Sequence, residues 1–294
     1  MASEQDQWNT RRQERAARRE KQRKEQKRLL LGLAAAAVVL LVSVVAIVAI
    51  SRGGSTPPVE TQPQLQETTP VATQPEQTTE PTSRRDREST TTIHIKAAGD
   101  LNITDSVVAS GTSQLAMGYD YTKAFMDVAP VLSDADLTVM NFEGNLSGEP
   151  YGSETTSAPQ ELVQALSAAG VDILQAANSC TVNNGLRGMS STLGGIRHAG
   201  IEPVGAFTDS REFQRSKGYT ICNVQGVKVA VVAFTKGMGG LGLPAGNESC
   251  VNVLYKDYAT TYREVDKQGI TTILENLAEE SPDITIAMLH WGSE

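Results

Sequence analysis

Residues 93–294 alternate between short apolar segments and longer segments with helical periodicity. The apolar segments predict strands at 92–100, 135–143, 171–178, 201–206, 218–234 and 284–290, the fifth being a hairpin around Gln225-Gly226. The periodic segments predict helices at 121–132, 158–170, 185–200 and within 257–280. Repeated strand–helix–strand units with continuously apolar strands indicate an α/β fold, with a mostly parallel sheet covered by helices. The last segment, Ile284–His290, is expected to be a buried strand.

Four of these strands end in polar residues, namely Asp100, Glu143, Asn178 and His290. If the strands belong to one parallel sheet, their carboxyl ends meet at the edge where such sheets bind ligands. Carboxylate oxygens, an amide oxygen and an imidazole nitrogen suit divalent ions such as Mg²⁺, Mn²⁺ or Zn²⁺. We therefore predict a metal site formed by all four residues, with His290 and Asn178 also taking part in catalysis if the protein is an enzyme. A divalent ion there would polarise a phosphoryl or carbonyl centre or bind a carboxylate.

The chain before residue 93 has three parts of distinct composition. Residues 1–28 hold ten Lys or Arg against five Asp or Glu, whereas residues 29–50 carry no charge. At about 1.5 Å rise per residue, the uncharged run is long enough to cross a bilayer core of roughly 30 Å. The basic flank predicts a cytoplasmic tail, a single-pass anchor at 29–50 and an extracytoplasmic C-terminal domain; a cleavable signal peptide is the alternative. Residues 51–92 are rich in Pro, Thr, Gln and Glu and are expected to form a disordered linker.

The net charge limits the kinds of partner that the chain can bind, and the cysteines bear on its disulfide bonding. The net charge of −8 includes the basic tail, so the outer part of the chain is clearly acidic. This argues against a nucleic-acid partner and against docking on anionic lipid, and leaves residues 29–50 as the expected contact with the bilayer. Cys180, Cys222 and Cys250 all fall on the outer side, where a Cys222–Cys250 disulfide and three free thiols both remain open.

Four segments, in order, resemble the CapA family of poly-γ-glutamate capsule synthesis proteins. They are "AAGDLNITDSV", "ADLTVMNFEGNLS", "VDILQAANSCTVNNGLRGMSSTLGGIRHAGI" and "IAMLHWGSE", which span nearly all of residues 93–294. The resemblance implies a layered α/β sandwich of the calcineurin-like metallophosphoesterase type, whose strand ends hold a metal pair. It also implies a membrane-anchored protein at the bacterial cell surface that works with other membrane subunits. Its implied ligand is an anionic glutamate polymer or a phosphate-containing compound. The family's proteins would help to make, export or attach that polymer.

Two departures from the family pattern bear on catalysis. The family usually has an Asn-Asn-His turn with an Asp three residues on, where this chain has Asn178-Ser179-Cys180 and then Asn183. The family's domain also normally continues past His-Trp-Gly-x-Glu into a His-rich turn, so this chain is expected to be a fragment of it. In the part present, Glu294 could orient His290. A metal-dependent hydrolase and a non-catalytic binding or assembly subunit therefore both remain open.

Two further motifs suggest other functions. A basic tail, an anchor, a stem and an α/β domain also describe a type II glycosyltransferase, with Asp134-Ala135-Asp136 as its metal-binding DxD. That triplet precedes its strand, however, so its carboxylates are expected at the wrong edge of the sheet. Lys236 and the glycine-rich stretch after it lack the Ser or Thr of a phosphate-binding loop. They predict a mobile loop, with a position over the site edge as the alternative.

Overall fold

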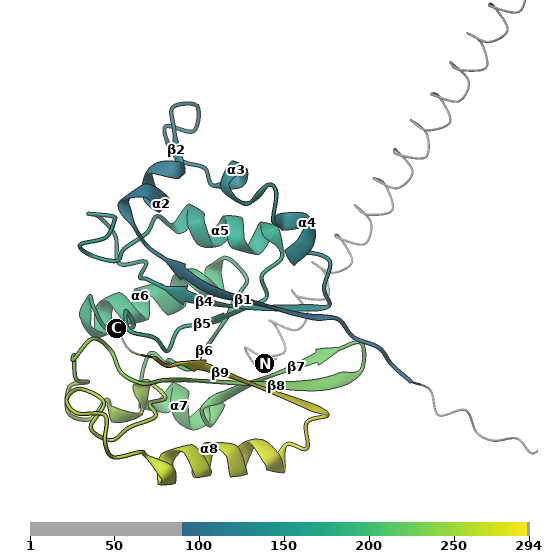
Figure 1. Cartoon of the computed structure of the whole chain (residues 1–294), viewed down its shortest axis with the longest axis vertical. Coiled ribbons are helices and arrows are strands. Elements are labelled where there is room, and N and C mark those ends of the chain that lie inside the picture. Colours follow the sequence, from purple (N-terminus) through teal and green to yellow (C-terminus); the bar gives the residue numbers. More distant parts are fainter. Residues whose placement is uncertain (1–89, 293–294) are drawn as a thin grey trace, which may run out of the picture. The chain divides into compact units, whose positions relative to one another are not determined.

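The computed structural model describes residues 90–292, which form four stacked layers (Figure 1). The first sheet contains β1 (Ile95–Asn102), β4 (Leu137–Glu143), β5 (Ile173–Gln175) and β6 (Glu202–Val204), all parallel and in the order β1-β4-β5-β6. The second sheet contains β7 (Tyr219–Val224), β8 (Val227–Thr235) and β9 (Ile284–His290). In it β7 and β8 form the antiparallel hairpin predicted around Gln225-Gly226, and β9 runs parallel to β8. The α/β fold class is thus confirmed.

Helices cover the outer faces of both sheets. On the first sheet lie α5 (Gln160–Ala169) and α6 (Gly185–His198), with the short α2 (Asp105–Ser110), α3 (Thr122–Phe125) and α4 (Ala129–Leu132) (Figure 1). On the second sheet lies α8 (Lys267–Glu279). The remaining elements are the hairpin of β2 (Thr112–Ser113) and β3 (Gly118–Tyr119), α7 (Ser210–Ser216) and the 3₁₀ turn η1 (Glu248–Cys250).

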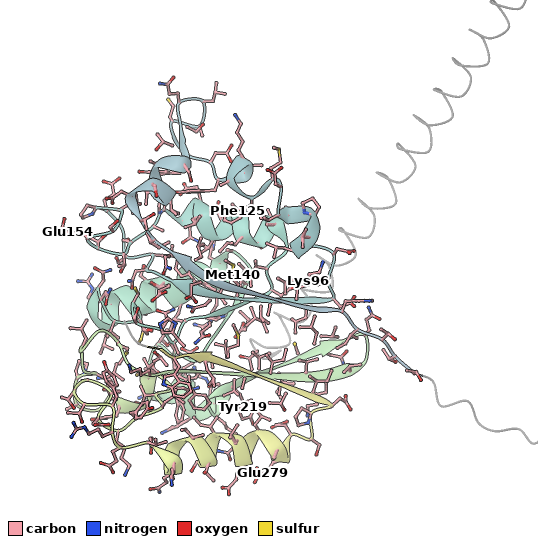
Figure 2. All side chains as sticks on the ribbon, viewed as in Figure 1. Lys96, Phe125, Met140, Glu154, Tyr219 and Glu279 are labelled. Atoms are coloured by element: carbon pink, nitrogen blue, oxygen red, sulfur yellow. The ribbon has the colours of Figure 1, made fainter. Side chains whose placement is uncertain are left out.

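The alternation of side chains along β4 explains why the layers stack. Met140 points toward the helices (Figure 2), and it packs with Phe142 and residues of α5 in one apolar cluster. Leu137 and Val139 point the other way and pack against valines of β8 in the second sheet. A strand buried on both faces is mostly apolar, and β4 is apolar up to Met140 apart from Thr138. On the far side of the second sheet, Tyr219 packs in a cluster that includes α8 residues (Figure 2).

The structure corrects two local predictions. The helix expected over 121–132 is two short helices, α3 and α4, because Pro130 lies in the first turn of α4 and lacks the N–H that a continuous helix would require. The strand Ile284–His290 is present, but it is not fully buried: its residues alternate between partly buried and exposed. The reason is its position at the edge of the second sheet, with one face toward the inter-sheet core and the other incompletely covered by α8 within the described residues.

The predictions for the tail at 1–28, the anchor at 29–50 and most of the linker at 51–92 fall outside the described residues, as does Glu294. Between residues 90 and 292, none of the helices has the length and apolar character that a membrane crossing requires.

Candidate metal centre

Three of the four predicted ligands meet at the carboxyl ends of the strands. Oxygen atoms of Asp100 and Glu143 and a ring nitrogen of His290 all lie within 4.8 Å of one another. Asp100 is exposed, whereas the side chains of Glu143 and His290 are only 14% and 21% exposed. Two carboxylates come from the first sheet, on β1 and β4, and the imidazole comes from β9 of the second sheet. The cluster therefore lies at the end of the core between the two sheets.

The strand geometry places these side chains on one face. Along β4, Glu143 has the same alternation as Leu137 and Val139, which face the second sheet. On β9, His290 continues the inward-facing row of Ile284, Ile286 and Met288 in the same way. The candidate site is thus the polar end of an apolar core.

A bulge in β1 brings Asp100 into the same row. The pairing of β1 with β4 shifts between Ala97, which is opposite Val139, and Asp100, which is opposite Asn141. Three residues of β1 therefore match two residues of β4, and the extra residue restores the inward direction at position 100. Without the bulge, the alternation would turn Asp100 toward the helices.

Hydrogen bonds orient the three candidate ligands. The Nδ2 group of Asn141 donates to Oδ1 of Asp100 at 2.8 Å and lies 3.4 Å from Nδ1 of His290. The hydroxyl of Ser179 donates to Oε1 of Glu143. That oxygen also lies 3.4 Å from Nε2 of His290. Asn141 thus fixes one oxygen of Asp100, and Ser179 fixes one oxygen of Glu143.

The donor set fits a divalent ion. The second oxygens, Oδ2 of Asp100 and Oε2 of Glu143, have no hydrogen-bond partner among residues 90–292, so each is free to bind a cation. Two carboxylate oxygens with one imidazole nitrogen suit Mn²⁺ or Zn²⁺ better than Mg²⁺, because an imidazole favours transition metals. Outer hydrogen bonds of the kind made by Asn141 and Ser179 are a regular part of metal sites.

Asn178 lies behind this cluster. It is 1% exposed, and its Nδ2 donates to Oδ1 of Asn141 at 3.0 Å and to the carbonyl of Phe142 at 2.7 Å. Its Oδ1 accepts the backbone N–H of Cys180 at 3.0 Å. The observed role of Asn178 is therefore to fix the position of Asn141 and the turn that follows β5. Its ligand and catalytic roles, and the catalytic role of His290, stay predictions.

The residues that depart from the family pattern are accounted for structurally. Cys180 is buried and forms no disulfide, and its carbonyl accepts a hydrogen bond from Asn145 at 3.1 Å. Asn183 donates to the hydroxyl of Thr156 at 3.2 Å. Cys222 and Cys250 are also buried and form no disulfide, so of the two alternatives for the cysteines the structure has three thiols and no Cys222–Cys250 disulfide.

Sequence reasoning did not single out Asn141 and Ser179 as site residues. The signal for Asn141 was available, because it stands two residues before Glu143 on the same strand and shares its face. The signal for Ser179 was weaker, since its contact with Glu143 depends on the turn after β5 folding back over β4. The DxD alternative loses its support: Asp134 and Asp136 precede β4, at the opposite edge from Glu143.

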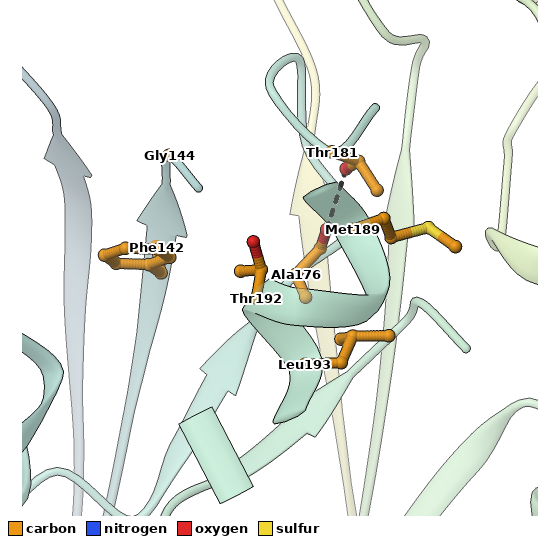
Figure 3. Close-up of a pocket in the computed structure, with 7 residues that line it drawn as sticks. All are labelled: Phe142, Gly144, Ala176, Thr181, Met189, Thr192 and Leu193. Atoms are coloured by element: carbon orange, nitrogen blue, oxygen red, sulfur yellow. Dashed lines mark hydrogen bonds between the residues drawn. The ribbon is translucent and has the colours of Figure 1, made fainter. Parts of the chain in front are cut away.

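An apolar pocket lies beside the candidate site and is distinct from it. Figure 3 shows it between β4 and α6, lined by seven residues that include Phe142, Met189 and Leu193. The hydroxyl of Thr181 on its wall donates to the carbonyl of Ala176 at 2.7 Å (Figure 3). None of its lining residues belongs to the candidate ligands, so we interpret it as a packing gap beneath the turn that carries Asn178 and Ser179.

Comparison with known proteins supplies the family. Residues 94–294 match the family described as "Bacterial capsule synthesis protein PGA_cap". A "Capsule biosynthesis protein CapA" of Bacillus anthracis is 27% identical over 189 residues, which are 60% of this chain and 42% of that protein. A "PGA biosynthesis protein CapA" of Bacillus subtilis (strain 168) is 26% identical over 178 residues, or 58% of this chain and 42% of that protein. The matched region thus spans about two-fifths of the length of either relative. Since the family match covers well over half of the chain, the chain belongs to the bacterial capsule synthesis protein PGA_cap family.

Proposed function

We propose that this protein takes part in the synthesis, export or attachment of an anionic surface polymer of the poly-γ-glutamate type, with a divalent metal ion at Asp100, Glu143 and His290. The observation that carries the proposal is the convergence of these three side chains within 4.8 Å at the end of the inter-sheet core. The names of the two Bacillus relatives support the polymer class, since both are described as capsule or PGA biosynthesis proteins.

The chain's own groups prepare the site for such an ion. Asn141 directs one oxygen of Asp100 inward by its hydrogen bond and leaves the other oxygen free. Glu143 is only partly exposed, so its charge is costly unless a cation neutralises it. A divalent ion would supply a Lewis acid that polarises a phosphoryl or carbonyl oxygen of the substrate. His290, on the opposite sheet, would then supply the imidazole ligand of that ion.

The test is metal binding by the full chain purified in detergent. We expect calorimetric titration with Mn²⁺ or Zn²⁺ to show binding that Asp100→Ala and His290→Ala each abolish. Asp134→Ala is the matched control, because that exposed carboxylate precedes β4 at the far edge of the sheet and should leave binding unchanged. Hydrolysis of a generic phosphodiester and of a γ-glutamyl peptide should follow the same pattern. If the two site variants bind metal as well as the wild-type protein does, the proposed centre is wrong.

A non-catalytic binding or assembly subunit is the second candidate, and Cys180 favours it. At the position where the family pattern has a histidine, this chain has a thiol that is buried and lies beside Ser179. A buried thiol cannot exchange protons with a substrate as an imidazole does. The two candidates separate in one experiment: a binding subunit retains affinity for the polymer and for metal but hydrolyses neither test substrate, and Cys180→His would not restore turnover.

The remaining parts of the proposal concern location and partners. We propose a single-pass anchor at residues 29–50, a cytoplasmic tail at 1–28 and an extracytoplasmic domain on the linker at 51–92, with other membrane subunits of polymer synthesis as partners. Support comes from the uncharged run and its basic flank. Protease added to intact cells should remove the domain and leave a short membrane-bound fragment. Complete protection of the domain in cells with an intact surface would contradict this topology.

A further inference from the structure

We propose that Lys236, held against the ring of Tyr262, forms an anion subsite beside the candidate metal centre and binds a carboxylate of the polymer. This inference rests on the proposed function, because it assigns the neighbouring contact of the same substrate. It goes further in naming a residue that neither the site geometry nor the family match identifies.

The backbone of Lys236 is fixed to the strand that carries His290. Thr235, the last residue of β8, is paired with His290, and the N–H of Lys236 donates to the carbonyl of His290 at 2.8 Å. The Nζ group of Lys236 donates to the carbonyl of Gly292 at 2.7 Å, two residues further along the chain. The ammonium group therefore lies next to the end of β9, on the second-sheet side of the cluster.

The side chain of Lys236 is held in place but its charge is not neutralised. Its Nζ lies 4.6 Å from the centroid of the Tyr262 ring, and that ring packs edge to face against Tyr255 with centroids 6.1 Å apart. Within residues 90–292, the partners of this ammonium are a carbonyl oxygen and an aromatic face, and no carboxylate forms an ion pair with it. Lysines 96, 217, 228 and 256 each pair with a carboxylate. An ammonium group has three donors, so at least one remains for a ligand.

The loop that follows Lys236 is built to keep this arrangement. A Cβ at position 237 would lie 2.5 Å from the carbonyl of Tyr258 and 2.6 Å from Cε1 of Tyr262, so only glycine allows the backbone to pass so close to the ring. Met238 is fully buried, and the hydroxyl of Tyr258 accepts the N–H of Leu243 at 3.0 Å. The glycine-rich stretch is therefore anchored at both of these points, at the edge of the site.

The charges explain why such a subsite is needed. A chain with a net charge of −8 repels a polyanion, so binding requires local positive charge. A divalent ion between Asp100 and Glu143 would be neutralised by those two carboxylates. Lys236, next to the end of β9, would then supply a positive charge for a further carboxylate of the polymer.

The test compares Lys236→Gln, Lys236→Arg and Lys256→Gln in the full chain, using fluorescently labelled poly-γ-glutamate and, separately, Mn²⁺. Loss of a charge-assisted hydrogen bond predicts about tenfold weaker polymer binding for Lys236→Gln. Lys236→Arg should retain most of the affinity. Lys256→Gln is the matched control, because that lysine already pairs with Glu264 at 2.7 Å. All three variants should bind Mn²⁺ like the wild-type protein.

The outcomes separate this inference from the proposed function. Wild-type affinity for the polymer in Lys236→Gln, or an equal loss in Lys256→Gln, overturns the subsite. Lys236-dependent polymer binding in a protein that binds no metal sustains the subsite and refutes the metal centre. Should Lys236→Gln fail to fold, acetylation of the wild-type protein decides: the polymer should protect Lys236 from the reagent, whereas its esterified form should not. Equal labelling with and without polymer also overturns the inference.

Discussion

Replacement of Asn141 by leucine should weaken both the stability of the domain and its affinity for metal. Asn141 is 4% exposed, and leucine has the same number and branching of side-chain heavy atoms, so the replacement mainly removes the polar contacts. Two hydrogen bonds are lost, the one donated to Asp100 at 2.8 Å and the one accepted from Asn178 at 3.0 Å, together with the 3.4 Å contact with Nδ1 of His290. Hydrogen bonds to a charged group contribute roughly 1.5–3 kcal/mol and those between neutral groups about 1 kcal/mol.

The leucine offsets part of that loss, because it buries apolar surface that asparagine does not. We therefore expect a net loss of about 2 kcal/mol in the free energy of unfolding, which lowers the Tm of a domain of this size by about 4–8 °C. Without Asn141 to orient Asp100, affinity for Mn²⁺ should fall by about 10–100-fold. Thermal unfolding followed with and without Mn²⁺ measures both effects.

The matched control for this prediction is Asn276→Leu. Asn276 is on α8, away from the site, and its side chain makes no hydrogen bond among the described residues. Its replacement should change the free energy of unfolding by less than about 0.5 kcal/mol. If Asn141→Leu keeps the wild-type Tm and the wild-type affinity for Mn²⁺, then Asn141 does not organise the site and the reasoning is refuted.

Three further predictions concern positions away from the ligands. Burial raises the pKa of the Cys250 thiol, so the native protein should resist thiol reagents at neutral pH, and all three cysteines should react after denaturation; a disulfide found in the oxidised protein would contradict this. Backbone hydrogen bonds, first from Arg263, lower the pKa of Asp257 to about 2 from an ordinary value of 3.8. The ionised Asp257 carboxylate thus stabilises the fold above about pH 4, and this contribution is lost as the pH falls toward 2. The stability of Asp257→Asn should not show this loss on acidification. Gly205→Ala, at φ +90° and with its Cβ 2.7 Å from that of Ala177, should cost about 2 kcal/mol or more; an unchanged Tm would show that the backbone relaxes.

Local patterns were sufficient for most of the fold. Helix α5 was expected from residue 158 and ends as predicted at Gly170, whose φ of +116° is the left-handed conformation that glycine favours. The hairpin around Gln225-Gly226 is predictable because two mostly apolar strands flank a turn that contains a glycine, and Gly226 has a φ of +90°. In these cases a few neighbouring residues determine the structure, so the sequence alone suffices.

Features that depend on distant contacts were harder to predict. The apolar composition of Ile284–His290 suggested a buried strand, but burial depends on where a strand lies in its sheet, and β9 is at an edge. Trp291, the residue after β9, is 67% exposed for the same reason. The strands were also expected to form one sheet, whereas His290 reaches Glu143 from a second sheet. The division into two sheets follows from how the apolar faces dock, which the periodicity of a single strand does not reveal.

The origin of the three candidate ligands on two different sheets affects how the site comes into being. Asp100 and Glu143 become neighbours as soon as β1 and β4 pair, but His290 joins them only when the two sheets have docked face to face. An ion bound by all three would link the two sheets, which are otherwise held together by apolar packing. Metal affinity would then report on the completed tertiary structure, and a chelator would loosen the docking of the sheets before it disturbed the strands within them.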